Sequence, residues 1–268
     1  MERPAWASLD IDIDKPSASR IYDAHLGGSH NFQVDRDAAK KIVQFMPELP
    51  EILRANRSYL RRAVRYLAGQ GITQFLDLGS GIPTVGNVHE IAWQANPDCK
   101  IVYVDVDPVA VAHSQAILSG SERATAVHGD LRQPKGILDN PEAQQLLDFS
   151  QPIAVLMVAV LHFVPDSDDP IGVIRQYLDA VVPGSYLAIS HASLQGSSPK
   201  QAEDATRQFR SSVTDFSMRT RAEITDLFTG LELVEPGVVY LTEWRPDVGD
   251  EVRAPERMST FAGMGRKP

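Results

Sequence analysis

The chain has 268 residues, which is long enough for one large domain, or one domain with a cap, to bury a sizeable core. Hydrophobic residues make up 43% and charged residues 23%, close to globular averages, which excludes a disordered or collagen-like chain. Lys and Arg total 26 against 35 for Asp and Glu, and the net charge of −9 disfavours a general attraction to nucleic acid or anionic membranes.

The compartment is predicted from the cysteine content and the N-terminus. A single cysteine, Cys99, leaves no internal disulfide and no multi-cysteine metal site. Residues 1–16 carry acids where a secretory signal needs basic residues. The longest apolar run, residues 153–161, is about half of what a membrane-spanning helix needs. We therefore expect a cytoplasmic protein without a membrane segment.

Residues 1–70 are predicted to form a cap or entry segment. A loop rich in Asp, Gly, His and Ser precedes two helical stretches, and the clearer one covers residues 51–67. Its apolar residues lie near one face, whereas five arginines between Arg54 and Arg65 lie largely on others. We expect these arginines to be solvated or paired with acids rather than to form a track for phosphates.

Residues 71–268 are predicted to form a doubly wound α/β domain, because runs rich in β-formers alternate with helical patterns. The predicted strands are residues 74–78, 100–106, 124–128, 153–161 and 186–190. The predicted helices are residues 85–95, 109–118, 141–147 and 170–181. Strands this apolar indicate a parallel sheet covered on both faces.

The C-terminal third is predicted to complete the sheet. Residues 197–216 and 221–228 read as helical crossovers. Two further β-rich runs, residues 232–244 and 259–264, are separated by a charged loop that contains prolines, which suggests a terminal antiparallel hairpin.

The strongest local motif is a glycine-rich turn after the first strand. Gly79 and Gly81 allow a sharp turn and a close approach of a ligand, and the next helix would offer amide donors at its N-terminus. The turn reads GxGxP, with Thr84 where a dinucleotide site has its third glycine. Asp77 would lie beneath the turn and face a cation more readily than a pyrophosphate.

Two further acids end the second and third strands. Asp105 is expected to accept hydrogen bonds from both hydroxyls of a ribose. Asp130 could accept from an adenine amine, and the Leu131 amide could donate to the ring. All three motifs meet at the carboxyl edge of the sheet, where doubly wound folds bind ligands.

In this order, D-x-G-x-G, V-D-x-D-P and G-D-L resemble the class I S-adenosylmethionine-dependent methyltransferases. More narrowly, the chain is similar to the actinobacterial S-adenosyl methyltransferase family, long catalogued as a domain of unknown function. The segments that carry this resemblance are residues 19–39, 56–67, 74–84, 158–166, 183–193 and 235–247. YDAHLGGSHNF, within the first of them, is the most specific.

The resemblance implies a Rossmann-like, doubly wound seven-stranded sheet with the last strand antiparallel, and an N-terminal helical cap folded over S-adenosyl-L-methionine. The predicted cofactor-binding residues are Asp77, Gly79, Ser80, Gly81, Asp105, Val106, Asp130, Leu131, Val158, Tyr22, Gly28, His30 and Asn31. The resemblance does not supply an acceptor, for which we expect a small or medium-sized metabolite. It also leaves the oligomeric state open.

The predicted catalytic residues are His162, which follows the fourth strand, and Tyr22 in the N-terminal loop. A packing role remains the stronger alternative for His162 and for His191. We expect no metal site, because His25 and His30 lack an accompanying cluster of acids or cysteines.

Other functions are disfavoured but stay open. After the fourth strand the sequence reads VAVLH, without the Asn/Asp-Pro-Pro-aromatic turn of enzymes that methylate exocyclic amines of nucleic acids. Cys99 lies at the wrong edge for cytosine chemistry. A non-catalytic cofactor-binding module and an NAD-dependent oxidoreductase remain as alternatives, the second only because of the shared glycine turn and ribose acid.

Overall fold

A computed structural model of the chain describes residues 12–83, 86–193, 195, 207, 216–249 and 254–268. Most of the predicted helical stretch 197–216 therefore lies outside the described residues, as do Thr84 and Val85. Within the described ranges, no helix is long and apolar enough to span a membrane.

One mixed sheet organises the fold. Its parallel strands are β1 (Gln74–Leu78), β2 (Lys100–Asp105), β3 (Ala124–His128), β4 (Ala154–Val158) and β5 (Tyr186–Ala192). The antiparallel β8 (Thr260–Arg266) lies beside β5 and pairs on its other edge with β6 (Glu232–Leu233) and β7 (Val239–Tyr240). The order β3-β2-β1-β4-β5-β8-β6 confirms the doubly wound arrangement with an antiparallel last strand, and the two-residue β7 adds an eighth strand to the described sheet.

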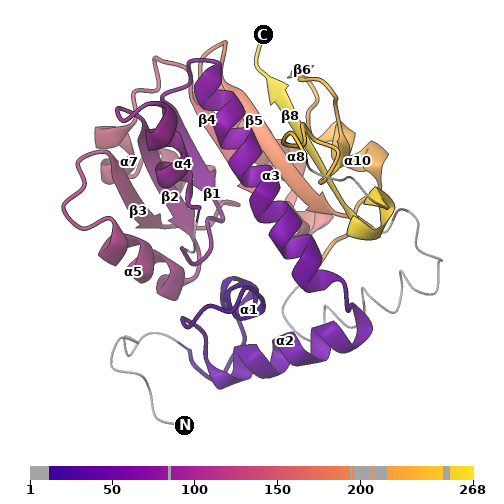
Figure 1. The fold of residues 1–268 in the computed structure, drawn as a ribbon. Helices are drawn as coiled ribbons and strands as arrows, with labels where there is room; N and C mark the ends of the chain where they lie inside the picture. Colours follow the sequence, from indigo (N-terminus) through magenta and orange to yellow (C-terminus); the bar gives the residue numbers. More distant parts are fainter. Residues whose placement is uncertain (1–11, 84–85, 194, 196–206, 208–215, 250–253) are drawn as a thin grey trace.

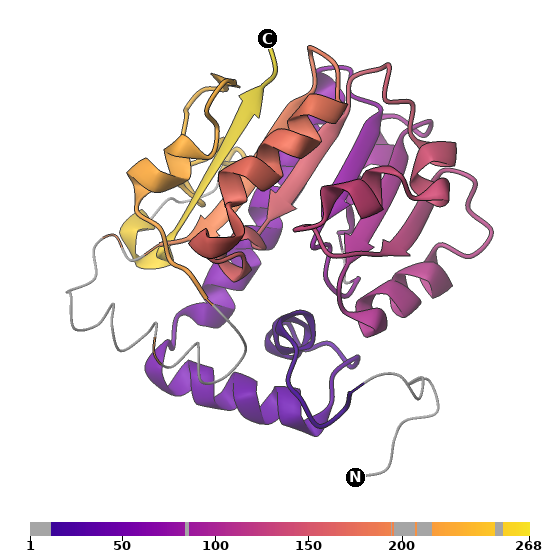
Figure 2. The ribbon, with the colours of Figure 1, turned by 180° about the vertical axis from the view of Figure 1, so that it is seen from behind.

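Helices cover both faces of this sheet (Figures 1 and 2). On one face, α3 (Leu49–Gly69) crosses the sheet and packs with α4 (Val88–Ala95). The other face carries α6 (Pro134–Leu138), α7 (Pro141–Leu146), α8 (Pro170–Ala180) and α10 (Arg221–Asp226). The helix α5 (Pro108–Ile117) packs against β2 and β3. The five parallel strands thus bury side chains on both faces, as their apolar sequences require.

The first two helices lie apart from these layers. α1 (Ala18–His25) and α2 (Gln33–Phe45) sit below the ends toward which the parallel strands point (Figure 1). α3 then leads from this end up along the sheet, with its apolar stripe of Ile52, Leu60, Val64 and Leu67 buried. The N-terminal segment is therefore placed over the carboxyl edge of the sheet.

The fourth strand is shorter than the sequence indicates. The predicted run 153–161 ends as a strand at Val158, because Ala159 adopts a left-handed backbone with φ 56° that cannot continue the ladder. The chain then turns through the 3-10 helices η1 (Leu161–Phe163) and η2 (Asp166–Asp168). This bend brings residues 159–164 to the carboxyl edge of the sheet.

The C-terminal run 232–244 is likewise two short strands rather than one. Between them and β8 lies the 3-10 helix η3 (Pro255–Met258). Trp244 is fully buried and makes edge-on ring contacts with Tyr59 and Tyr66 of α3. The predicted antiparallel pairing with the last strand is confirmed, and the packing of Trp244 fixes this region to α3.

Candidate functional site

A cavity of about 700 Å³ lies between the carboxyl ends of β1, β2 and β4 and the helices α1, α2 and α3. This volume is within the range of small-molecule sites. Its lining includes eleven of the fourteen residues that the sequence nominates: Tyr22, Asp77, Gly79, Ser80, Gly81, Asp105, Val106, Asp130, Leu131, Val158 and His162. Gly28, His30 and Asn31 do not line it.

The glycine turn is fixed to the neighbouring strand. The amides of Gly79 and Ser80 donate to the carbonyl of Val104, at 2.8 and 3.0 Å. Gly79 has φ +74°, and a Cβ built there would lie 2.3 Å from Cγ2 of Val160. Only glycine fits this position, so the turn can bend sharply and leave its backbone facing the cavity.

Asp105 closes the turn from the end of β2. One carboxylate oxygen accepts from the Gly81 amide at 2.7 Å, and the other accepts from the Asp107 amide at 2.8 Å and from the Ser19 hydroxyl at 3.4 Å. Burial raises the pKa of this carboxyl to about 6, although these donors oppose the shift. The carboxylate retains acceptor capacity for a ligand hydroxyl.

Asp77 is the second buried acid of the cavity. In the described part of the chain we find no hydrogen bond to its carboxylate, although the residue is only 5% exposed. Burial, together with the charge of Asp105, raises its pKa to about 7, while the charge of Arg57 acts in the opposite sense. A buried acid without donors is costly unless a cation reaches it, so the site suits a ligand with a positive group.

Arg57 of α3 also lines the cavity, and sequence reasoning missed this role. Its guanidinium donates to the carbonyl of Gly86 at 3.1 Å. Leu53, Asn56, Arg57 and Leu60 all line the cavity, and this i, i+3, i+4, i+7 spacing was the available signal for a face of α3 turned toward a ligand.

Two other arginines of α3 are engaged within the fold. Arg62 is buried and donates to the carbonyls of Trp244 at 2.9 Å and Leu241 at 2.6 Å. Arg65 pairs with Asp247 at 2.7 Å. These contacts agree with an acid-paired or structural helix rather than a track for phosphates.

The third predicted acid is already engaged. Arg132 binds both carboxylate oxygens of Asp130, with its closest contact at 2.6 Å, and also pairs with Asp168 at 3.0 Å. These contacts lower the pKa of Asp130. Leu131 is buried, and its carbonyl accepts from the Tyr177 hydroxyl at 2.9 Å. Asp130 therefore reaches the cavity as a paired carboxylate. Val106, which is 60% exposed, lies at the cavity rim.

The Tyr22 hydroxyl is held in a network. It donates to the carbonyl of Leu53 at 3.1 Å and accepts from the Asn56 amide at 3.1 Å. The Asn56 side-chain oxygen in turn accepts from the Ser190 hydroxyl at 2.5 Å. Burial raises the pKa of Tyr22, so the phenol stays protonated at neutral pH. These hydrogen bonds join α1 to α3 and β5.

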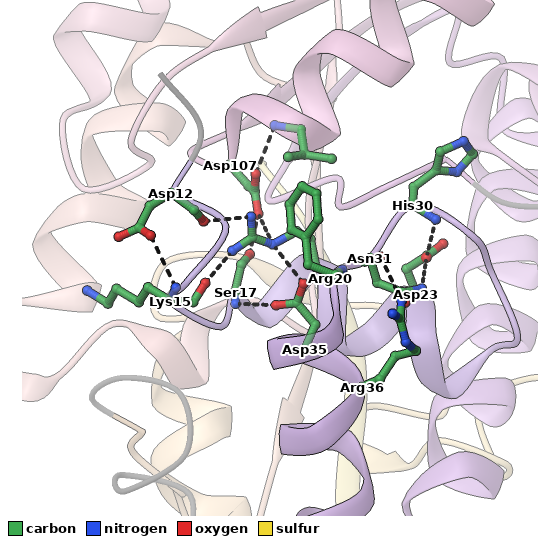
Figure 3. Close-up of polar contacts among 12 residues, drawn as sticks. Asp12, Lys15, Ser17, Arg20, Asp23, His30, Asn31, Asp35, Arg36 and Asp107 are labelled. Carbon is green, nitrogen blue, oxygen red and sulfur yellow. Dashed lines mark hydrogen bonds and ion pairs between the residues drawn. The ribbon is translucent and has the colours of Figure 1, made fainter. Parts of the chain in front are cut away.

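Gly28, His30 and Asn31 build the loop between α1 and α2. Asp23 accepts from the His30 amide at 3.0 Å and from the Asn31 side chain at 2.7 Å (Figure 3). A Cβ on Gly28 would lie 1.9 Å from Oδ1 of Asp23. The ring of His30 packs on His113 of α5, with centroids 3.6 Å apart. These residues thus form a closely packed loop beside the cavity, and their cofactor-binding role stays a prediction.

A buried ion network anchors the same segment to the sheet edge (Figure 3). Arg20 pairs with Asp35 at 3.3 Å and with Asp107 at 3.7 Å, and all three side chains are almost fully buried. Its guanidinium also donates to the carbonyls of Asp12 at 3.2 Å and Lys15 at 2.6 Å. Ser17 donates its hydroxyl to Asp107 and its amide to Asp35. Since Asp107 also caps α5, the network joins α1, α2 and α5 next to Asp105.

His162 and His191 have different surroundings. His191 is fixed: it contacts the Arg219 guanidinium through Nε2 at 2.7 Å and the Ala192 carbonyl through Nδ1 at 2.7 Å, and burial lowers its pKa to about 4. His162 lines the cavity, and its buried Nδ1 has no hydrogen-bond partner in the described ranges. Burial and the charge of Arg219 lower the pKa of His162 well below its ordinary value, so the imidazole is neutral.

Arg219 fixes the bend that carries His162. This buried arginine donates to the carbonyls of Leu161 at 3.0 Å and Val164 at 2.9 Å, and pairs with Asp166 at 2.6 Å. Ala159, with its left-handed backbone, also lines the cavity. Strained backbone of this kind persists where the surrounding structure holds it in place, often at functional sites.

Comparison with known proteins places this arrangement in a family. The sequence matches the S-adenosyl methyltransferase family over residues 4–268. No curated protein matches the chain. A crystal structure of a candidate methyltransferase from Thermobifida fusca YX has 40% identity and a TM-score of 0.92, covering 98% of this chain and 99% of that one.

Two further structures are similar. A DUF574 family protein from Streptomyces avermitilis MA-4680 has 38% identity and a TM-score of 0.90, covering 96% of this chain and 99% of that one. The N-methyltransferase NodS from Bradyrhizobium japonicum WM9, in complex with S-adenosyl-l-homocysteine, shares the fold with a TM-score of 0.52 at 14% identity, over 87% and 97% of the two chains. The predicted family and the predicted cofactor, S-adenosyl-L-methionine, are confirmed, and the chain belongs to the S-adenosyl methyltransferase family.

Proposed function

We propose that the protein transfers the methyl group of S-adenosyl-L-methionine to a small-molecule acceptor inside this cavity. The observation that carries the proposal is the buried Asp77 carboxylate, which lacks hydrogen-bond donors in the described structure and lies beside the cavity-lining Arg57. The amino acid end of the cofactor has one positive and one negative group. Asp77 would hold its ammonium group, and Arg57 would hold its carboxylate.

The remaining cofactor contacts follow from the sheet edge. Asp105 would accept from the ribose hydroxyls, and the glycine turn would let the backbone approach the adenosyl group closely. Val106 and Leu131 would contact the adenine ring, with Asp130 at the rim. Bound there, the cofactor supplies an electrophilic methyl group.

We also propose that two parts of the chain have different functions. Residues 1–70 act as a cap, and residues 71–268 form the methyltransferase domain. Support comes from the lining of the cavity, to which α1, the end of α2 and the first half of α3 contribute one wall. A cap that covers the site excludes water from the transfer.

A small acceptor is favoured over nucleic acid by charge and geometry. The chain carries a net charge of −9, and Arg62 and Arg65 of α3 are engaged within the fold. A phosphate backbone would need a surface of unpaired cations.

Isothermal titration tests the cofactor assignment. Micromolar binding of S-adenosylmethionine and S-adenosylhomocysteine is expected, without binding of NADH. Asp105→Ala should weaken both adenosyl ligands at least tenfold by removing the ribose contacts. Asp98→Ala serves as the control, because Asp98 is exposed on the far side of β2 from the turn. Unchanged affinity in a folded Asp105→Ala protein would refute the assignment.

Turnover requires a separate assay, because a non-catalytic cofactor-binding module would bind both ligands equally well. The protein is incubated with S-adenosylmethionine carrying a labelled methyl group and with pools of small molecules. Label transferred to an acceptor supports an enzyme. Binding without transfer from any pool favours the module.

A further inference from the structure

The cavity has a second end that differs from the cofactor end in chemistry. Its wall is apolar and comes from three separate parts of the chain: the end of α2 with the start of α3, the 3-10 helix η1, and the chain before α10. The residues are Ile42, Met46, Leu49, Phe163, Phe216 and Met218, which line the cavity and also pack together as one hydrophobic cluster.

The polar groups that line the cavity near this wall include two imidazoles. His162 lies in its aromatic part, with ring centroids 4.5 Å from Phe163 and 4.9 Å from Phe216. His25, at the end of α1, contributes an Nε2 that is buried and has no partner among the described residues. Buried polar atoms are nearly always hydrogen-bonded, so an unpartnered nitrogen on a residue that lines a cavity favours a ligand that brings a donor. Both nitrogens are covered in this structure, so a donor reaches them only after the imidazole ring turns toward the cavity.

None of these groups carries a charge at neutral pH. The six wall residues are apolar, and burial lowers the pKa of both His25 and His162. The acids Asp77 and Asp105 belong to the cofactor end. A charged acceptor would lose its hydration against this wall without gaining a counter-ion from it, which is unfavourable.

The position of His162 in the fold relates this wall to the cofactor end of the cavity. His162 follows β4, which lies beside β1 in the sheet, and Asp77 is part of β1. His162 lines the same cavity as the acids of the cofactor end and contacts the aromatic wall, so it links the two ends.

We propose that the apolar end is the acceptor site and that it takes a neutral, mainly aromatic or aliphatic molecule whose hydroxyl group donates a hydrogen bond to Nδ1 of His162. This inference rests on the proposed function and names its substrate class. The hydroxyl oxygen forms the new bond to the methyl carbon, the sulfur–carbon bond breaks, and its electron pair stays on sulfur. His162 Nδ1 receives the proton that the hydroxyl loses and gives it to water after the methylated product has left the cavity.

The test uses the full chain saturated with S-adenosylhomocysteine and three probes with one ring system: 2-naphthol, naphthalene and naphthalene-2-sulfonate. Binding is measured by calorimetry or fluorescence. We expect 2-naphthol to bind and the sulfonate to bind at least tenfold more weakly. His162→Phe keeps an aromatic ring, so it should weaken 2-naphthol about five- to tenfold and leave naphthalene unchanged.

A second pair of variants tests the wall independently of His162. Met218→Lys should weaken both 2-naphthol and naphthalene at least tenfold, whereas Met218→Leu, which conserves volume, should change neither more than about twofold. Both variants should retain the wild-type affinity for S-adenosylhomocysteine, which shows that they fold.

The outcomes separate the two proposals. Equal binding of the sulfonate and 2-naphthol, or no binding of any probe to the loaded protein, would overturn the acceptor class while leaving the cofactor assignment intact. An equal loss of 2-naphthol and naphthalene in His162→Phe would remove the hydrogen bond from the proposal. Failure of S-adenosylhomocysteine itself to bind would overturn the proposed function.

Discussion

The two walls of the cavity are built on different physical principles. The sheet wall consists of strand ends, where backbone hydrogen bonds from Gly79, Ser80 and Gly81 fix the turn to β2 and to Asp105. The cap wall consists of side chains from α1 and α2, and these helices are attached to the sheet edge through the ion network of Arg20, Asp35 and Asp107.

From this difference we infer that one wall binds the cofactor and the other selects the acceptor. Backbone geometry is shared among proteins with many sequences, which suits a wall that binds one common cofactor. Side chains on a cap can change without altering the sheet, which suits a wall that selects an acceptor. The Arg20 network lies where the walls meet, since Ser19 reaches Asp105 while Ser17 and Arg20 reach Asp107.

The first and largest effect is expected from Arg20→Met, which should detach the cap wall from the sheet wall. The substitution leaves Asp35 and Asp107 buried without their cation, and removing one partner of a buried ion pair costs about 3–5 kcal/mol. Chemical denaturation should show a loss of this order, together with weaker binding of S-adenosylhomocysteine.

Arg61→Met is the matched control for this experiment. Arg61 is exposed on α3 and makes a long hydrogen bond of 3.4 Å to the Ser58 hydroxyl, one helical turn away. Its replacement should change the free energy of unfolding by less than about 0.5 kcal/mol. If both variants were equally stable, the Arg20 network would not be the anchor of the cap.

Gly79→Ala should distort the glycine turn of the sheet wall and leave the cap helices in place. The new Cβ would lie 2.3 Å from Val160, on a backbone with φ +74° that disfavours alanine. Overpacking and strain together should cost about 2–4 kcal/mol and abolish measurable cofactor binding. Gly136→Ala is the control, because a Cβ at Gly136 would meet no atom within 4 Å and its helical site favours alanine by up to about 1 kcal/mol.

The sheet wall could be predicted from sequence because its signals are local. A strand, a glycine turn and an acid such as Asp77 follow one another within a few residues, and the strand ends of a parallel sheet must meet at one edge. Asp105 was found in the same way. The fourth strand was predicted too long because of Ala159, since a left-handed alanine carries no sequence signal of its own.

The cap wall could be predicted only in outline. The ion network joins Arg20 to Asp107, and the hydroxyl of Ser17 reaches an acid 90 positions away, which no local pattern reveals. Gly28 and Asn31 were nominated for the cofactor because polar loops with glycines often close over ligands. In the structure Asn31 donates to Asp23 and Gly28 lies against it, which are contacts that the sequence did not predict. Pairings between distant side chains depend on the tertiary structure, and a single sequence does not contain them explicitly.

Asp77→Asn should stabilise the fold and at the same time weaken cofactor binding at the sheet wall. Because burial raises the folded pKa to about 7 from an ordinary 3.8, the ionised form destabilises the fold, and this cost grows between those two pH values. The variant should therefore be more thermostable than wild type at pH 8, with a smaller gain at pH 5. It should also bind S-adenosylhomocysteine at least tenfold more weakly.

The exposed Asp98→Asn variant provides the comparison for Asp77→Asn, since it removes the same charge from the surface. It should change neither thermostability nor affinity. Lower stability of Asp77→Asn at pH 8 would show that the carboxylate has a stabilising partner, and the proposed ammonium site would then have to be abandoned.

The smallest expected effect is a release of protons when the cofactor product binds. At pH 6 the Asp77 carboxyl is largely protonated and Asp105 is partly so, because burial raises their pKa values to about 7 and about 6. An ammonium group beside Asp77 and hydroxyl donors at Asp105 favour the ionised forms, so binding must lower both pKa values and expel protons. Calorimetric titration of S-adenosylhomocysteine at pH 6, in two buffers with different ionisation enthalpies, should report release of between one and two protons, and the release should be much smaller at pH 7.5. Asp77→Asn should remove most of the release at pH 6.

Uptake of protons, or the same release at both pH values, would mean that these two carboxyls do not face the cofactor. The sheet wall would then lose its assigned role in cofactor binding.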